Sequence, residues 1–142
     1  MTIPPAWPLV LGYFGTPLVI EPSPGQLSGD ARLLPVRQLD ERIGLTRAFA
    51  DVLDDPRDPG LTAHTPLEMV RSRVYGILAG YADQNDHDTL RASPVSKLIA
   101  GRSPEDHALA SQPTLSRFEN AISIKSLKRL RDIFLDRKRS RA

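Results

Sequence analysis

Residues 108–120 read ALASQPTLSRFEN, and this stretch predicts a short polar helix. Pro113 suits the first turn of a helix, because its missing N–H needs no partner there, and either polar residue before it can cap the turn. Over about two turns the helix then offers hydroxyl, guanidinium and amide groups, which contact DNA phosphates and base edges. The alternative is an exposed amphipathic helix whose Leu115 and Phe118 face the core.

A basic run follows this stretch, so the charge of the chain is unevenly distributed. Residues 116–142 carry nine Lys or Arg against three Asp or Glu, whereas residues 1–115 carry ten against fourteen. This segregation favours a polyanion such as nucleic acid as the partner of the basic end. The alternative is a solvated amphipathic helix with a basic tail.

The candidate DNA contacts divide into two chemical groups. Cations would neutralise phosphates, which supplies much of the affinity of nucleic-acid binding. Hydroxyl and amide groups would position the chain or read base edges. The cations are Arg117, Lys125, Lys128, Arg129 and Arg131, and the polar groups belong to Ser111, Thr114, Ser116 and Asn120. The segment 94–120 is not expected to form a tight helix-turn-helix, because its connecting loop is about ten residues where three or four are usual.

The pattern of elements predicts a mainly α fold with an extended or β-hairpin arm at its start. We expect a proline-rich arm over residues 1–27, a helical domain over 28–136 and a basic tail over 137–142. Within the arm, two short β-prone runs at 9–11 and 18–20 are separated by glycines, which would allow a loose hairpin.

Start and stop signals place the expected helices. An apolar stripe that ends at Gly44 predicts a first helix, and Thr46 can cap a second. The clearest start is the capping box Thr65-Pro66-Leu67-Glu68, which opens the expected central core helix. The first stripe is Leu33, Leu34, Val36, Leu39 and Ile43, and the core helix carries Leu67, Val70, Val74, Ile77, Leu78 and Tyr81.

Two further starts lie in the second half of the chain. Ser93-Pro94 opens a helix that ends at Gly101, and Ser123 starts a last helix. The apolar side of this last helix is expected to consist of Ile124, Leu127, Leu130, Ile133, Phe134 and Leu135.

No complete active site is evident from the residue pattern. The chain has no cysteine, so disulfides and thiolate metal sites are excluded. The cluster Asp83, Asp86, His87 and Asp88 lacks the glycine and terminal glutamate of a calcium loop and is interpreted as a polar turn. Neither a nucleophile motif nor a glycine-rich phosphate loop is present. No apolar run is long enough for a membrane span, so we expect no membrane partner and a cytoplasmic location.

Several stretches in a fixed order resemble the N-terminal part of bacterial insertion-sequence transposases of DDE domain group 1, in the thirteen-eighty family. They are GQLS at 25–28, LDERIGL at 39–45, DDPRDP at 54–59, GYAD at 80–83 and LASQPTLSRFEN at 109–120. The resemblance implies a helical region that precedes an RNase H-like catalytic core. In that core three acidic residues hold two Mg²⁺ ions for strand cleavage and transfer.

After Asp136 the chain reads RKRSRA and ends, where the resemblance would lead into the catalytic sheet. We therefore expect a segment truncated before the RNase H-like domain, with no catalytic residue and no cofactor of its own. The expected function is binding of double-stranded DNA at element ends, or assembly of a homo-oligomer, near the nucleoid. The alternatives are a purely protein–protein module of a transposase and a nonfunctional remnant.

Overall fold

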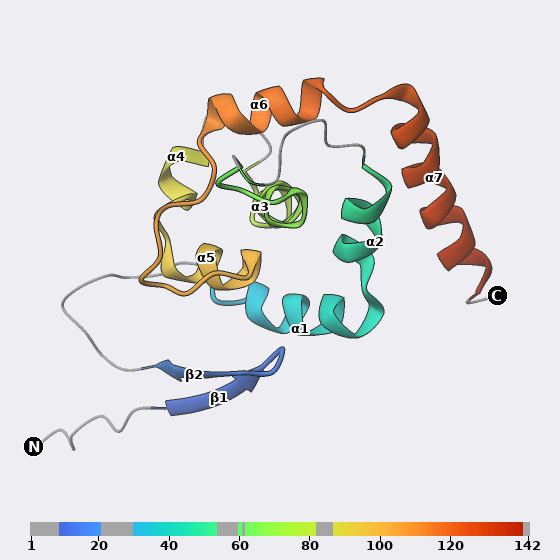
Figure 1. The fold of residues 1–142 in the computed structure, drawn as a ribbon. Coiled ribbons are helices and arrows are strands. Elements are labelled where there is room, and N and C mark those ends of the chain that lie inside the picture. The colour runs from blue at the N-terminus through green and yellow to red at the C-terminus, as the bar shows by residue number, and fades with distance from the viewer. Residues whose placement is uncertain (1–8, 21–29, 54–59, 61, 82–86, 141–142) are drawn as a thin grey trace, which may run out of the picture.

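The computed structural model describes residues 9–20, 30–53, 60, 62–81 and 87–140, and these are mainly helical. In chain order the elements are β1 (Leu9–Tyr13), β2 (Thr16–Ile20), α1 (Leu33–Ile43), α2 (Leu45–Val52), α3 (Pro66–Leu78), α4 (His87–Leu90), α5 (Pro94–Ala100), α6 (Gln112–Asn120) and α7 (Ile124–Arg139). Figure 1 shows α3 at the centre, with the other helices around it and α7 at one edge beside α2. The predicted mainly α fold with an N-terminal hairpin is confirmed.

The two strands form an antiparallel hairpin that lies against α1. Its two-residue turn has positive φ at both positions, 38° at Phe14 and 78° at Gly15. Such a turn matches the twist of the strands, and glycine adopts its conformation without strain. Phe14 is held there by α1, because its N–H donates to the side chain of Gln38 and the guanidinium of Arg37 lies 5.0 Å from its ring centre. The hairpin is therefore attached to the helical body through its turn.

Side-chain caps begin the longest helices where the sequence predicts them. Thr65 Oγ1 accepts a hydrogen bond from the N–H of Glu68 at 3.2 Å, which starts α3. Ser123 Oγ accepts one from the N–H of Ser126 at 3.1 Å, which starts α7. Each bond satisfies an amide that has no partner within the helix. Gly44, at φ 65°, ends α1 as expected.

The apolar core consists of two clusters, one on each side of α3. The first joins the hairpin, α1, α3 and α5 and contains Leu18, Leu33, Leu34, Tyr75, Val95 and Ile99. The second fixes α6 on α3 and contains Met69, Ala110 and Leu115, with Phe118 packed against them. Because Leu115 and Phe118 both face this cluster, Pro113, Arg117 and Asn120 are left exposed on the outer side of α6.

The apolar stripe predicted for α1 is only half correct. Leu39 is 54% exposed and Val36 is also exposed. The inward face is instead completed by Arg37 and Asp40, which are both buried. These two side chains find polar partners inside the body, and burial of a paired polar group costs much less than burial of an unpaired one. Because of this polar pairing, the buried face of α1 differs from the face that hydropathy alone predicts.

The same correction applies to α3. It is the central helix as predicted, but Ile77 and Leu78 at its end are exposed. Val70 is buried as expected, and Met69, Ser72 and Tyr75, which were not predicted, are buried with it.

The start of α2 and the end of α7 also differ from expectation. Thr46 is the second residue of α2 and not its cap. Its N–H donates to the side chain of Asp40 at 3.0 Å, so the preceding helix supplies the capping group. At the other end of the chain, α7 continues to Arg139, so that residues 137–139 of the expected basic tail are helical.

Candidate nucleic-acid interface

α6 is fixed on the body by one face, which determines the face it presents to solvent. Leu115 is fully buried, and on the same side Glu119 Oε1 lies 2.7 Å from the Nε of Arg73 on α3. Arg117 and Asn120 are exposed, together with Pro113 one turn earlier. Because these three positions are spaced four and three residues apart, they form one outward stripe.

The predicted hydroxyl residues at the start of α6 and within it make side-chain hydrogen bonds inside the protein. Ser111 Oγ and Thr114 Oγ1 lie 3.0 Å apart and hydrogen bond to each other. Ser116 Oγ accepts from the side-chain amide of Gln112 at 3.3 Å. All of these side chains are partly buried. They organise the first turn of α6, and their arrangement suits positioning better than direct contact with bases.

A three-residue turn joins α6 to α7, and sequence reasoning missed its importance. α6 ends at Asn120 and α7 begins at Ile124, so only residues 121–123 lie between them. Figure 1 shows α7 turning away from the direction of α6 after this connection. Two helices joined by three or four residues at a large angle are the geometry of a helix-turn-helix. The Ser123 cap could have indicated it, because it ends the turn so soon after the polar helix.

α7 carries most of the positive charge near this turn. The helix has seven basic residues and two acidic ones, a net charge of +5. The four predicted phosphate contacts on it, Lys125, Lys128, Arg129 and Arg131, are all exposed. Arg131 also lies 3.3 Å from Asp132, but both partners are exposed, so water screens this pair strongly. Four of the five predicted cations thus lie on the helix that follows the turn, and the fifth, Arg117, lies on α6 before it.

The inner face of α7 rests on α2 and on the end of α1. The ring of Phe134 contacts the ring of Phe49 edge to face, with their centres 4.9 Å apart. Arg137 donates to the main-chain oxygens of Ile43 at 2.7 Å and Gly44 at 3.3 Å. These oxygens lie at the negative end of α1, where a cation is favourable.

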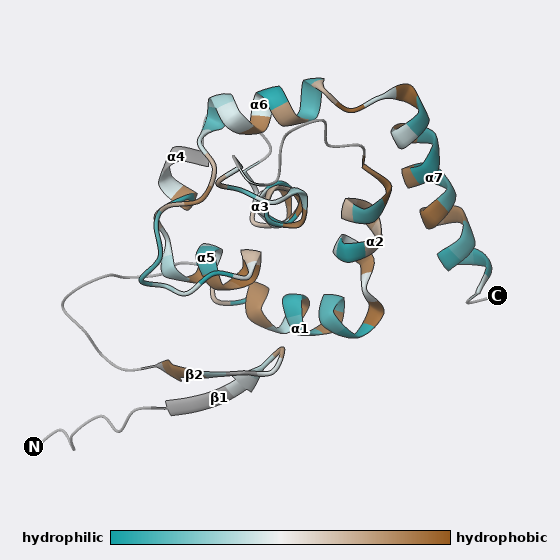
Figure 2. Cartoon of the chain, viewed as in Figure 1, coloured by the Kyte–Doolittle hydropathy of each residue, from teal (hydrophilic) through white to brown (hydrophobic). Residues whose placement is uncertain are grey.

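The apolar side predicted for α7 is largely outside the core. Ile124, Leu127, Phe134 and Leu135 are exposed, and only Leu130 and Ile133 are partly buried. Figure 2 shows hydrophobic and hydrophilic residues mixed along the visible face of this helix.

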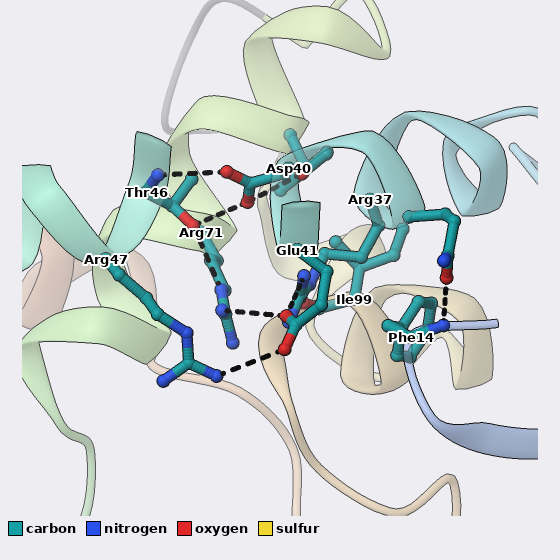
Figure 3. A network of polar contacts seen from close by, with 10 residues as sticks. Phe14, Arg37, Asp40, Glu41, Thr46, Arg47, Arg71 and Ile99 are labelled. Carbon is teal, nitrogen blue, oxygen red and sulfur yellow. Dashed lines mark hydrogen bonds and ion pairs between the residues drawn. The ribbon is translucent and has the colours of Figure 1, made fainter. Parts of the chain in front are cut away.

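A second polar cluster, in the body, is built from paired charges (Figure 3). Arg37 donates to Glu41 Oε2 at 2.7 Å and to the main-chain oxygen of Ile99 at 3.0 Å. Arg71 Nε donates to Thr46 Oγ1 at 3.2 Å, and its terminal nitrogen lies 3.9 Å from Glu41. Arg37 and Arg71 are both buried. The cluster ties α1, α2, α3 and α5 together, which is a structural role.

The pKa values in this cluster follow from its pairing. Burial alone would raise the pKa of Asp40, but hydrogen bonds from Thr46 and from the hydroxyl of Tyr75 hold it below its ordinary value. The hydrogen bond from Arg37 lowers the pKa of the Glu41 carboxyl. Burial lowers the pKa of the Arg71 guanidinium, and the neighbouring arginines lower it further. Both carboxylates are therefore stabilised as anions between cations and hydroxyl donors.

A third group fixes the loops around the start of α3. The carboxylate of Glu68 accepts from Arg102 Nε at 2.9 Å and lies 2.6 Å from His64 Nδ1. Arg102 also donates to the main-chain oxygen of Ala63 at 2.7 Å. The capping box is thus only half formed, because its glutamate binds these two side chains.

Comparison with known proteins identifies the family of this chain. The family described as transposase DDE domain group 1 matches residues 13–140, which is most of the chain. The chain belongs to this transposase family. No curated protein and no solved structure matches it closely.

The buried carboxylates that the structure of this transposase-family chain describes are bound by other side chains. Within the described residues, no three His, Asp or Glu side chains form a group that could hold a metal ion. The buried carboxylates of Asp40, Glu41 and Glu68 are already bound by hydroxyl, guanidinium or imidazole groups. The predicted turn at Asp83 and Asp86, and the side chains of His87 and Asp88, lie outside the described part.

In the part of the chain that the structure describes, no helix combines the length and the apolar character needed to cross a bilayer.

Proposed function

We propose that this chain binds double-stranded DNA during transposition through α6, the three-residue turn and α7. The observation that carries the proposal is the exposed group of four cations on α7, directly after a turn of helix-turn-helix length. Ionic contacts to phosphates supply much of the affinity of such interfaces. Membership of a transposase family makes DNA at element ends the expected ligand.

The two helices would contribute different contacts. Lys125, Lys128, Arg129 and Arg131 would bind phosphates, and exposed Arg117 would add a cation from α6. Asn120 is exposed beside the turn, and its amide can pair with a base edge. Ser111, Thr114 and Ser116 would hold the first turn of α6 in place through the hydrogen bonds they already make.

Salt dependence tests the proposal directly. The chain should shift a duplex in a mobility assay, and its affinity should fall steeply between two salt concentrations. Each phosphate contact contributes about 0.9 to the slope of log affinity against log salt. In a variant with alanine at positions 125, 128, 129 and 131, the magnitude of this slope should fall by about three to four. Unchanged binding by that variant would refute the interface.

The matched control removes a cation from another face. Arg42 is exposed in the last turn of α1, so Arg42→Ala removes the same charge as Arg129→Ala without touching α6 or α7. We expect Arg42→Ala to bind DNA like the unaltered chain. An equal loss in both single variants would show that only total charge matters.

We further propose that the chain alone does not cleave DNA, since its buried carboxylates are engaged in internal pairs. Incubation with a supercoiled plasmid and Mg²⁺ or Mn²⁺ should leave the plasmid intact. Nicking by the purified chain, lost on metal chelation, would contradict this.

A second candidate function is assembly of a homo-oligomer. It is favoured by the exposed apolar residues Ile124, Leu127, Phe134 and Leu135 of α7, because burying them against a second copy would be favourable. Size-exclusion chromatography of the same sample separates the two proposals. Oligomers that give no mobility shift would favour assembly, and a shift by a monomer would favour DNA binding.

A further inference from the structure

The outermost stripe of α7 has two basic side chains between two aliphatic ones. The packed face of the helix runs through Ser126, Leu130, Ile133 and Arg137, all buried or partly buried. Two positions earlier at each step, and therefore on the opposite side of the helix, lie Ile124, Lys128, Arg131 and Leu135. All four of these are exposed.

Ile124 stands out within this stripe. It is the first residue of α7 and is 72% exposed, more than any other large hydrophobic residue described. The Ser123 cap and the fully buried Ser126 fix the first turn, so the direction of Ile124 is set by the body of the protein. Burying this side chain against a ligand would be favourable by the ordinary hydrophobic effect.

We propose that Ile124 contacts thymine methyl groups in the major groove of DNA, while Lys128 and Arg131 bind the neighbouring phosphates. This inference rests on the proposed DNA-binding function and assigns one specificity-determining residue to it. In helix-turn-helix proteins the first residues of the second helix reach the base edges. Thymine alone presents a methyl group there, and aliphatic side chains contact it.

Charge and dimensions select DNA over other partners for this stripe. A second copy would bring two α7 helices of charge +5 together, which like-charge repulsion opposes. From Ile124 to Arg131 the helix rises about 10 Å, at 1.5 Å per residue. That length corresponds to about three base pairs, so an aliphatic contact and two ionic contacts can reach neighbouring positions of one groove.

The experiment compares thymine with deoxyuridine, which lacks only the methyl group. A duplex is selected from a random-sequence pool by binding to the full chain, and each thymine in turn is then replaced by deoxyuridine. Affinity is measured by fluorescence anisotropy. We expect replacement of at least one thymine to weaken binding about fourfold, the effect of losing one buried methyl-sized group.

Two variants assign the effect to Ile124. Ile124→Ala should bind the thymine and deoxyuridine duplexes equally, with an unchanged salt slope. Val19→Ala is the matched control, because Val19 is another branched aliphatic residue, 60% exposed, on the distant hairpin. It should keep the full preference for thymine. Circular dichroism should show that both variants melt like the unaltered chain, since neither residue is buried.

Each outcome decides the inference separately from the proposed function. Equal affinity of the unaltered chain for all the substituted duplexes would overturn the inference and leave DNA binding intact. A thymine preference that survives in Ile124→Ala, or is lost in Val19→Ala, would also overturn it. Failure to select any duplex would refute the DNA-binding function. Anionic phosphatidylserine vesicles test the other anionic surface that a basic helix could bind, and binding to these vesicles alone would refute the function as well.

Discussion

The helical body and α7 use arginine in opposite ways. In the body, Arg37 and Arg71 are buried and are held by carboxylate, hydroxyl and main-chain oxygens. On α7 the basic residues outnumber the acidic ones by five, and most of them lie at the surface. A buried, paired guanidinium has its donors occupied and supports the fold. The exposed cations of α7 lie in water, where a pair such as Arg131–Asp132 is strongly screened. Burial, and not residue type, separates the two groups of basic residues.

The strongest way to test this contrast is to break the body cluster at Asp40. Asp40→Ala would leave the Thr46 amide and the Tyr75 hydroxyl without their acceptor, while Glu41 would still pair with Arg37 and Arg71. The free energy of unfolding should fall by about 2–5 kcal/mol, because each buried donor left without an acceptor costs about 1–3 kcal/mol. Urea denaturation measures this. Asp132→Ala on α7 is the control and should change stability by less than about 0.5 kcal/mol, because its ion pair is exposed.

Protonation of Asp40 and Glu41 at low pH should also lower the free energy of unfolding, but by less than Asp40→Ala does. The pKa values of Asp40 and Glu41 in the folded protein lie below their ordinary values of 3.8 and 4.5. A depressed folded-state pKa contributes stability above the ordinary value and loses it as the pH falls through the folded value. The unfolding free energy should therefore decrease below about pH 4.5, measured by urea titration from pH 7 to pH 3. In Asp40→Asn the decrease should be shallower, and identical profiles would contradict the assignment.

The smallest effect is expected where α7 is attached to the body. Arg137→Ala removes two hydrogen bonds to main-chain oxygens at the end of α1 and should cost about 1–2 kcal/mol. The loss should be local. Amide hydrogen exchange should speed up along α7 and stay unchanged in α3. Arg139→Ala, which removes an exposed cation from the same turn, should leave exchange as it was.

The starts of α3 and α7 were predictable because they depend on nearest neighbours in the chain. Thr65 and Ser123 cap α3 and α7 through the amide three residues later, so a short stretch of sequence holds the whole signal. The hairpin was predictable for a similar reason, since glycines separate two β-prone runs. The basic group on α7 was also visible, as a local excess of charge.

The buried faces were not predictable from hydropathy. Asp40 caps α2 from α1 and also accepts from Tyr75, which lies 35 residues away in the chain. Such pairing turns charged residues inward and leaves Leu39 and Ile77 outside. A periodic pattern assigns every apolar residue to the core, because it contains no information about distant polar partners. For the same reason the apolar side predicted for α7 was mostly wrong, and the three-residue turn before it was overlooked.

The contact that Arg137 makes with α1 has a consequence for sequence variation. Its guanidinium donates hydrogen bonds to the main-chain oxygens of Ile43 and Gly44, and every amino acid has a main-chain oxygen. Replacing Ile43 with another aliphatic residue would therefore leave the acceptor in place, whereas Arg137→Lys could not span both oxygens with a planar fork. The two hydrogen bonds that the structure records between Arg137 and the end of α1 therefore depend on the guanidinium and not on the side chain at position 43.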